Sequence, residues 1–437
     1  LAGLAVAREG DRVAYVPAAR LGELSEALAD PAVPKALHDA KPLTRALLEA
    51  GGDLAGLACD TALAGYLVNP TERAPDLSAL ASELLGLEIE PEGAAAGSGK
   101  AQGAFDFSAG EPDLERAGRR ALAVARLVEP LTARLAASGG LELYREVDLP
   151  LVRVLARAEE AGILVDRDYL TELGEHLRDR LATLERQVHQ AAGEPFNINS
   201  TQQLREVLFE RLRLPVLKKT PKGAPSTDAS VLQKMVDSHP VVGHLLAYRE
   251  LEKLRSTYVD GMLPLIAADG RIHCVFNQTG AATGRISSER PNMQNIPVRS
   301  EEGRTIRRAF VAAPGHTFVV ADYSQIELRI LAHVSGDEGL RAAFAAGMDI
   351  HRDSAARVLR KDPADVTADE RSMAKMVNFG IAYGMSDYGL ASRASIPREQ
   401  AREFIDRYFA TYSGISYYMF HIKETARAQG YVTTLLG

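Results

Sequence analysis

Residues 367–384 place two cationic and two aromatic side chains at regular intervals of four. The segment reads TADERSMAKMVNFGIAYG. On an α-helix, four-residue steps advance by about 40° each, so such side chains form one slowly turning stripe. Two cations followed by an aromatic face and a phenol form a surface suited to a nucleoside triphosphate. The stripe consists of Arg371, Lys375, Phe379 and Tyr383.

The same segment predicts where this helix begins and which side it buries. Thr367 and Glu370 have the spacing of a capping box, which satisfies the first-turn amides of a helix that starts there. Gly384 loosens the far end. An ordinary amphipathic surface helix has the same pattern, so the stripe alone leaves both interpretations open. The opposite, apolar side contains Met373, Val377 and Ile381.

A second segment, HTFVVADYSQIELRILAH at 316–333, offers a carboxylate at the end of an apolar run. The run Phe318–Ala321 predicts a strand over 317–322, and the pattern becomes helical from about Gln325. Transfer of a phosphoryl group with two divalent ions requires rigid, hard oxygen ligands. Asp322, with the carbonyl of the next residue, is suited to that use. A helix cap or a turn residue is the alternative for a lone aspartate.

Together these segments resemble motifs A and B of the family A DNA polymerases, the bacterial DNA polymerase I group. DYSQIELR at 322–329 is similar to motif A, and R-x3-K-x3-FG-x2-YG at 371–384 is similar to motif B. TGRISSERPNMQNIPVRSEEGRTIRRAF at 283–310 resembles the stretch before motif A, and YRELEKLRSTYVD at 248–260 resembles the thumb. The resemblance runs in order from about 141 to 437.

The resemblance implies an α+β multidomain fold with the right-hand polymerase arrangement of thumb, partial palm and fingers. It implies template-directed DNA synthesis, in which a deoxynucleotide is transferred to a primer 3′-OH by a two-metal mechanism in DNA replication and repair. The implied cofactor is Mg²⁺, as two ions in the intact enzyme. The implied partners are primer–template DNA and deoxynucleoside triphosphates, and the implied state is a monomer.

Site residues follow from the same resemblance. Asp322 and the carbonyl of Tyr323 would hold Mg²⁺, while Arg371 and Lys375 would clamp the triphosphate. Glu327 would fill the space that a ribose 2′-OH needs, which favours DNA synthesis over RNA synthesis. The remaining nucleotide-binding residues implied are Gln325, His351, Phe379 and Tyr383.

The resemblance also implies contacts with the primer–template near the nascent base pair. Minor-groove acceptors there are nearly the same for every correct pair, so such contacts test shape without reading sequence. Asn and Gln in a Pro-bounded loop are otherwise common turn residues. The implied DNA-binding residues are Lys253, Arg255, Arg285, Asn292, Gln294, Asn295 and Arg299.

The chain departs from the family pattern at its ends. It begins at Leu1 and ends at Gly437, before the position of motif C, a His-Asp-Glu turn with the second metal-binding carboxylate. We therefore expect an internal piece of a longer polymerase, inactive alone because the two-ion site lacks that carboxylate. Two alternatives are a related single-subunit RNA polymerase, disfavoured by Glu327 and Phe379, and a non-catalytic DNA-binding remnant.

Composition agrees with a soluble protein of several domains. The chain has 437 residues, 25% of them charged, and 46% are hydrophobic; a single core rarely grows so large. No apolar run approaches the length of a membrane span. The isolated Cys59 and Cys274 predict reduced thiols in the cytoplasm. The net charge of −7 is unfavourable for DNA binding, but local basic clusters decide such contacts.

By position, residues 1–140 resemble a 3′–5′ exonuclease domain of α/β fold. GLAVAREGDRVAYVP predicts two strands with a turn at Glu9–Asp11. At positions where the family has its later metal-binding residues, this chain has Leu43, Arg120 and Val124. Apolar and cationic side chains do not bind Mg²⁺. We therefore predict a vestigial domain without proofreading.

Further helices and the domain boundaries complete the expectations. Leucines at steps of three and four predict a long helix from Asp166 to Gly193, and Ser200 with Gln203 predicts a second capping box. The segment 218–227 reads as a basic, Pro-rich loop. The predicted domains are a degenerate exonuclease-like domain at 1–140, a thumb at 141–265, a partial palm with motif A at 266–337, and helical fingers with motif B at 338–437.

Overall fold

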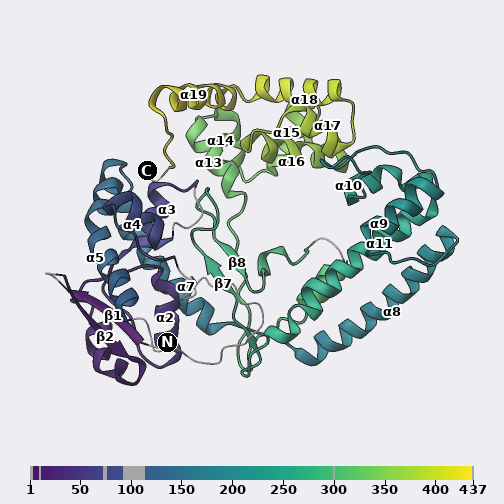
Figure 1. Cartoon of the computed structure of the whole chain (residues 1–437). Coiled ribbons are helices and arrows are strands. Elements are labelled where there is room, and N and C mark those ends of the chain that lie inside the picture. Colours follow the sequence, from purple (N-terminus) through teal and green to yellow (C-terminus); the bar gives the residue numbers. More distant parts are fainter. Residues whose placement is uncertain (1–2, 9–10, 72–75, 92–113, 299–300, 436–437) are drawn as a thin grey trace. The chain divides into compact units, whose positions relative to one another are not determined.

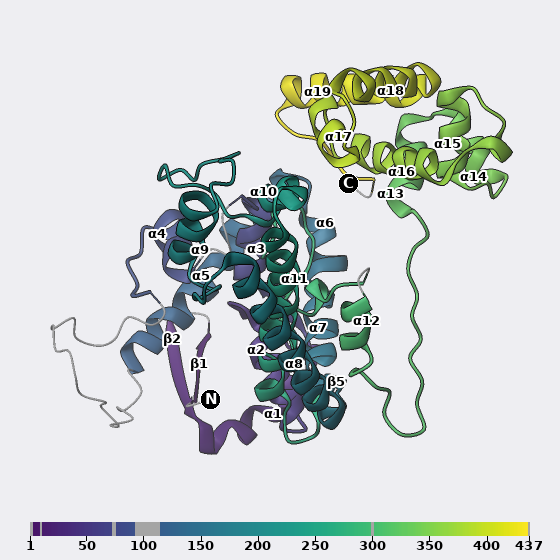
Figure 2. The same cartoon turned by 90° about the vertical axis from the view of Figure 1, so that its right-hand side faces the viewer.

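The computed structural model describes residues 3–8, 11–71, 76–91, 114–298 and 301–435. These residues divide into two compact units, Leu1–Phe318 and Val319–Gly437. Helices predominate in both, and the short strands pair two by two (Figures 1 and 2). None of the described helices is long and apolar enough to cross a membrane.

The first part of unit 1 combines two small sheets with helices. The predicted strands at the N-terminus are confirmed, as an antiparallel pair; Glu9 and Gly10 of the predicted turn lie outside the described residues. β3 and β4 pair in parallel, and their core is filled from α3, α4, α5 and α7. The elements are β1 Gly3–Arg8, β2 Arg12–Pro17, α1 Ser25–Ala29, β3 Lys35–Leu37, α2 Ala40–Glu49, β4 Leu57–Asp60, α3 Thr61–Val68, α4 Leu77–Leu85, α5 Leu114–Ala137, α6 Leu141–Leu143 and α7 Leu149–Ala161.

The second part of unit 1 is built around two long helices. α8 begins after Asp166, whose side chain accepts from the Tyr169 amide at 2.9 Å, and ends at Gly193 with φ 84°, which confirms the predicted helix. Its leucine face packs on α11 over a second core. The elements here are β5 Ile163–Leu164, α8 Arg167–Ala192, α9 Thr201–Arg205, α10 Ala229–Leu232, α11 Pro240–Leu254, β6 Arg271–Ile272, β7 Val275–Asn277, β8 Ser287–Glu289 and α12 Glu301–Arg307.

The second predicted capping box forms only in part. The Ser200 hydroxyl accepts from the Gln203 amide at 3.4 Å, so the N-cap is present. The Gln203 side chain instead accepts from the Asn197 amide at 2.8 Å. The Ser200 amide itself donates to the Asn197 carbonyl at 3.0 Å, so the reciprocal half of the box does not form.

Unit 2 is a helical body with one core of its own. α15 packs along α16, α18 packs on α15 and α17, and α19 returns to α13 (Figure 1). The helices are α13 Ile326–Ser335, α14 Glu338–Ala345, α15 Ile350–Leu359, α16 Ala368–Ala382, α17 Asp387–Ala394, α18 Arg398–Thr411 and α19 Ser413–Gln429.

The predicted strand 317–322 is wrong. These residues have irregular backbone outside any strand, and Val319 and Val320 are 88% and 93% exposed. A strand forms only when a neighbour pairs with its backbone groups, and no strand of the described residues pairs with this run. The helix predicted from about Gln325 is confirmed as α13.

Candidate functional site

The stripe of cations and aromatics lies on α16, as its spacing predicts. The capping box at its start is complete, because Thr367 Oγ1 accepts from the Glu370 amide at 3.2 Å and Glu370 Oε2 accepts from the Thr367 amide at 3.0 Å. Val377 and Ile381 are buried in the core of unit 2, and Met373 packs against it. This burial fixes the rotation of the helix and leaves the stripe on the other side.

The stripe side chains differ in exposure. Lys375 is exposed, Phe379 is half-buried, and Tyr383 is 61% exposed at the C-terminal cap. Arg371 is half-buried and its Nε donates to Asp349 Oδ2 at 2.8 Å. The stripe therefore offers one exposed cation and one cation already oriented by a carboxylate.

Asp349 is the N-cap of α15 as well as the partner of Arg371. Its Oδ1 accepts from the amides of His351 and Arg352, each at 3.1 Å. Burial alone raises the pKa of Asp349, but the hydrogen bonds from Arg371 and from these two amides outweigh it, so the pKa is lowered. The carboxylate thus stays ionised and joins the start of α15 to the stripe.

His351 lies beside the stripe and is buried, with 4% exposure. Its ring is 5.6 Å from the Phe379 ring, centroid to centroid, and its Nδ1 lies 3.1 Å from Asn378 Nδ2. Burial lowers the pKa of His351; Asp349 acts in the opposite direction, and Lys375 and Arg371 lower the pKa further. The imidazole is therefore neutral near pH 7.

Glu327 reaches the end of the stripe from the first turn of α13. The Tyr383 hydroxyl donates to Glu327 Oε1 at 3.3 Å. Leu328 and Leu331 of α13 are buried in the same core as α16, so the two helices hold this contact from both sides. The Glu327 carboxylate consequently lies next to the Tyr383 phenol at the last position of the stripe.

The side chains just before α13 make few hydrogen bonds with the rest of the protein. Asp322 is exposed and has no hydrogen bond or ion pair within the described ranges, and Tyr323 is 81% exposed. Gln325 adopts a left-handed conformation with φ 53° at the N-cap, and its Oε1 is buried without a partner among described residues. A carboxylate free of protein partners is available to an external cation.

Comparison with known proteins decides the family. A model described as DNA polymerase family A matches residues 167–437. The chain belongs to DNA polymerase family A. A second model, DNA polymerase I, ribonuclease H-like domain, matches residues 2–103. The α+β multidomain fold with an N-terminal exonuclease-like domain is thereby confirmed.

Relatives of this family A chain match it along its full length. DNA polymerase I of Geobacillus stearothermophilus is 43% identical over 441 residues, which cover 100% of this chain and 50% of the relative. DNA polymerase I of Chloroflexus aurantiacus is 44% identical over 454 residues, covering 100% and 48%. The chain thus spans about half the length of the curated relatives it matches.

A solved structure shows the same fold. The POL domain of Pol1 from M. smegmatis, in a complex with DNA primer-template and dNTP, superposes with a TM-score of 0.87 at 39% identity. The match covers 99% of this chain and 73% of that one.

Unit 1 of the family A chain carries the side chains predicted to contact DNA, and several already have structural roles. Arg255 pairs with Glu252 at 2.8 Å and also with Asp260. Asn292 Oδ1 accepts from the Gln294 amide at 3.1 Å, and Gln294 Nε2 donates to the Ile286 carbonyl at 3.0 Å. Lys253, Arg285 and Asn295 are exposed, whereas Arg299 lies outside the described residues.

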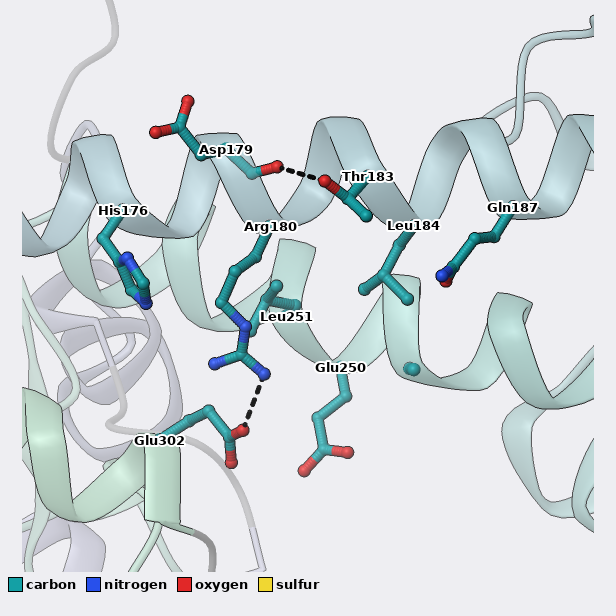
Figure 3. A pocket seen from close by; sticks show the side chains of 10 residues that line it. His176, Asp179, Arg180, Thr183, Leu184, Gln187, Glu250, Leu251 and Glu302 are labelled. Carbon is teal, nitrogen blue, oxygen red and sulfur yellow. Dashed lines mark hydrogen bonds and ion pairs between the residues drawn. The ribbon is translucent and has the colours of Figure 1, made fainter.

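A groove of unit 1 lies elsewhere, between α8 and α11 (Figure 3). It has a volume of about 420 Å³, and two of its lining residues, Arg180 and Glu302, form an ion pair of 3.3 Å. None of the described residues predicted to bind DNA or nucleotide lines it. The groove is therefore separate from the candidate site.

The exonuclease-like part holds the buried side chain of Asp60 in backbone hydrogen bonds. Asp60 ends β4, and its two carboxylate oxygens accept from four backbone amides at 2.8–3.2 Å, those of Asp39, Ala40, Ala62 and Leu63. Across the described ranges, no group of three or more His, Cys, Asp or Glu side chains is arranged to hold a metal ion. The predicted lack of proofreading stays a prediction.

The sequence did not predict the buried polar residues that form hydrogen bonds on the core side of α16. Asn378 is 1% exposed and Ser354 is fully buried, and both join His351 in one hydrogen-bonded cluster. The available signal was that Asn378 is four residues after Ala374, on the buried side of the helix. A polar residue among apolar positions indicates a buried partner.

Proposed function

We propose that the chain provides the nucleotide-binding site and part of the DNA-binding surface of a template-directed DNA polymerase that acts in replication and repair. The proposed reaction is attack of a primer 3′-OH on the α-phosphate of a deoxynucleoside triphosphate. Family membership supports this, and so does the stripe on α16 with His351 and Glu327 beside it.

The α16 stripe suits the parts of a nucleotide in order. Lys375 and Arg371 are placed to neutralise the triphosphate, where charge-assisted hydrogen bonds are roughly twice as strong as neutral ones. Asp349 already orients the guanidinium of Arg371, which lowers the entropy lost when a phosphate binds. Phe379 offers an aromatic face on which the sugar and base of the nucleotide pack. Tyr383 lies beyond Phe379 along the stripe and occupies the position of the template base.

The implied Mg²⁺ fits the donors that the structure presents. Mg²⁺ takes oxygen ligands, and in polymerases it is held by one or two carboxylates plus substrate phosphates. Asp322 is exposed and unpartnered in the described ranges, and the Tyr323 carbonyl follows it. When bound there, the ion would lower the pKa of the primer hydroxyl and stabilise charge on the phosphate.

We further propose the arrangement of domains and partners. Residues 1–140 form an exonuclease-like domain without proofreading, 141–265 a thumb, 266–337 a partial palm, and 338–437 fingers. Primer–template DNA contacts the exposed Lys253, Arg285 and Asn295 of unit 1. The protein acts as a monomer in the cytoplasm.

The exposed ammonium of Lys375 between Arg371 and Phe379 carries the proposal, and titration of the chain with Mg-dATP tests it. Lys375→Ala is expected to weaken binding by about 10- to 100-fold, the loss of one hydrogen bond to a charged group. Lys423→Ala is the matched control, because Lys423 is an exposed lysine on α19 of the same unit. Equal affinity of the chain and the Lys375 variant would contradict the proposed nucleotide site.

Activity is measured separately, as extension of a primer by the whole protein. Lys375→Ala is expected to abolish most extension, whereas Lys423→Ala leaves it unchanged. Extension that persists in the Lys375 variant would show that the stripe is not the nucleotide site of the reaction.

A further inference from the structure

The buried side of α16 holds a hydrogen-bonded chain that no predicted role of the stripe requires. Asn378 Nδ2 lies 3.1 Å from His351 Nδ1 and 3.1 Å from Ser354 Oγ. Ser354 Oγ in turn lies 3.0 Å from the Tyr412 hydroxyl. All four side chains are buried, from 0% to 4% exposed. Buried polar groups in such numbers have a defined pattern of donors and acceptors.

The donors and acceptors of Asn378 fix the protonation of the imidazole. An amide nitrogen carries two hydrogens and accepts nothing, so both of its neighbours must be acceptors. With the amide in this orientation, which leaves Asn378 Oδ1 without a partner among the described residues, His351 Nδ1 is unprotonated. In a neutral imidazole the single proton then resides on the other nitrogen, Nε2. Asn378 thus selects one of the two tautomers.

The surroundings of His351 make the choice of tautomer important for binding an anion at the stripe. Its ring packs against Phe379 of the stripe, and both Lys375 and Arg371 act on its charge state. Because burial and these cations keep the ring neutral, it is a hydrogen-bond donor only through a proton fixed on one nitrogen. With the proton on Nε2, the ring donates to an anionic oxygen; with the proton on Nδ1, Nε2 would offer a lone pair to that anion.

We propose that Asn378 is a positioning residue that holds His351 as the Nε2-protonated tautomer, so that this ring donates a hydrogen bond to the phosphates of the incoming nucleotide. The inference rests on the proposed nucleotide site and adds a residue that does not touch the substrate. This role also explains why a polar side chain occupies a buried position of α16 among apolar neighbours.

The tautomer is read directly by nitrogen NMR of the chain labelled with ¹⁵N-histidine. His351→Gln identifies the two ring signals of His351. The expected spectrum at pH 7.5 has a pyridine-type Nδ1 and a pyrrole-type Nε2. Asn378→Asp replaces the donor by an acceptor and is expected to move the proton to Nδ1 or to produce the imidazolium. A pyrrole-type Nδ1 in the unmodified chain would overturn the proposal.

Two further variants separate this role from folding. Ser354→Ala breaks the neighbouring hydrogen bond but leaves the contact of Asn378 with His351, so the tautomer is expected to stay unchanged. Asn378→Leu keeps the branched shape and the number of side-chain heavy atoms without burying a charge, and is expected to give a mixture of tautomers. A single Nε2-protonated form in Asn378→Leu would show that Asn378 does not select it.

Binding of Mg-dATP gives the functional readout. Asn378→Leu is expected to weaken binding by about three- to tenfold, the range for one hydrogen bond. His351→Ala should lose at least as much, and the double variant no more than His351→Ala, because Asn378 acts only through His351. Additive losses would overturn the proposal. If Lys375→Ala leaves binding unchanged, the nucleotide site itself fails, whatever the tautomer.

Discussion

The Tyr383 hydroxyl donates a hydrogen bond of 3.3 Å to Glu327 Oε1, and this contact joins the C-terminal cap of α16 to the first turn of α13. The two residues are 56 positions apart in sequence. Because both helices are anchored in the core of unit 2, the carboxylate is held in a defined place even though both side chains are exposed.

The first prediction concerns choice of sugar. In the proposed site Glu327 occupies the space that a ribose 2′-OH needs, so Glu327→Ala is expected to bring ribonucleotide incorporation by the whole protein within reach of deoxynucleotide incorporation. Primer extension with ATP and dATP in parallel measures the ratio. The hydrogen bond from Tyr383 steadies the carboxylate, so Tyr383→Phe should relax discrimination less than Glu327→Ala.

The control for sugar choice is Glu338→Ala, an exposed glutamate in the first turn of α14. It should leave the ratio unchanged. Unchanged discrimination in Glu327→Ala would contradict the assigned role. Comparable use of both sugars by the unmodified protein would instead favour the single-subunit RNA polymerase alternative.

Local patterns of the sequence predicted the helices of the site well. The capping box at Thr367, the end of α16 near Gly384 and the side that buries Val377 all follow from interactions within one turn or one helix. Such interactions depend only on residues close in sequence, and therefore the sequence predicts them.

Features that depend on distant residues were not predictable in the same way. The run at 317–322 has the composition of a strand, yet strand formation depends on a pairing partner that local sequence does not supply. Likewise, Asp349 was not singled out, because its contact with Arg371 spans 22 positions. The assignment of roles at Asp322 and Phe379 came from family resemblance rather than from periodicity.

The second prediction concerns stability against pH. The folded-state pKa of His351 is lowered from its ordinary value of 6.5. As the pH falls, His351 is protonated at a higher pH in the unfolded chain than in the folded chain. The free energy of unfolding therefore falls as the pH drops below about 6.5. The loss levels off below the lowered pKa. Asp349, whose pKa is lowered, keeps its charge throughout this window.

Urea unfolding of the chain between pH 5 and 8 measures this effect. The loss for one proton has a slope of at most about 1.4 kcal/mol per pH unit. His351→Gln removes the titrating group and should flatten the curve, whereas His421→Gln, at an exposed position on α19, should not. Parallel curves for the unmodified chain and His351→Gln would refute a buried neutral histidine.

The third prediction compares two neighbouring buried tyrosines in unit 2. The rings of Tyr408 and Tyr412 lie 4.9 Å apart, centroid to centroid, and burial raises the pKa of both, that of Tyr412 to about 12. Tyr412 bonds to Ser354 at 3.0 Å, but the Tyr408 hydroxyl has no partner among the described residues. An unsatisfied buried hydroxyl costs about 1–3 kcal/mol.

Opposite changes in stability are therefore expected from the same substitution. Tyr408→Phe should raise the free energy of unfolding by about 1 kcal/mol, and Tyr412→Phe should lower it by about the same amount. Thermal unfolding followed by circular dichroism measures both. A loss of stability in Tyr408→Phe as large as that in Tyr412→Phe would mean that the Tyr408 hydroxyl is satisfied.

The fourth prediction concerns the buried ion pair that ties α2 to α7 in unit 1. Glu159 is 2% exposed; it accepts from the Lys41 ammonium and, at 2.7 Å, from the Phe276 amide. Removing one partner of a buried pair leaves an uncompensated charge and costs about 3–5 kcal/mol. Glu159→Gln keeps a carbonyl for the Phe276 amide, so it tests the loss of the negative charge that faces Lys41 and, at 3.8 Å, Arg45.

Matched variants distinguish the pair from ordinary surface charge. Glu160→Gln, at the next and exposed position of α7, should be neutral within about 0.5 kcal/mol. The double variant Lys41→Met with Glu159→Gln removes the stranded ammonium and should recover much of the lost stability, since apolar replacement of a buried pair is often neutral. Urea unfolding compares all three. If the double variant is no more stable than Glu159→Gln, the unpaired lysine is not the source of the loss, and the second cation beside Glu159, Arg45 at 3.8 Å, would have to account for it.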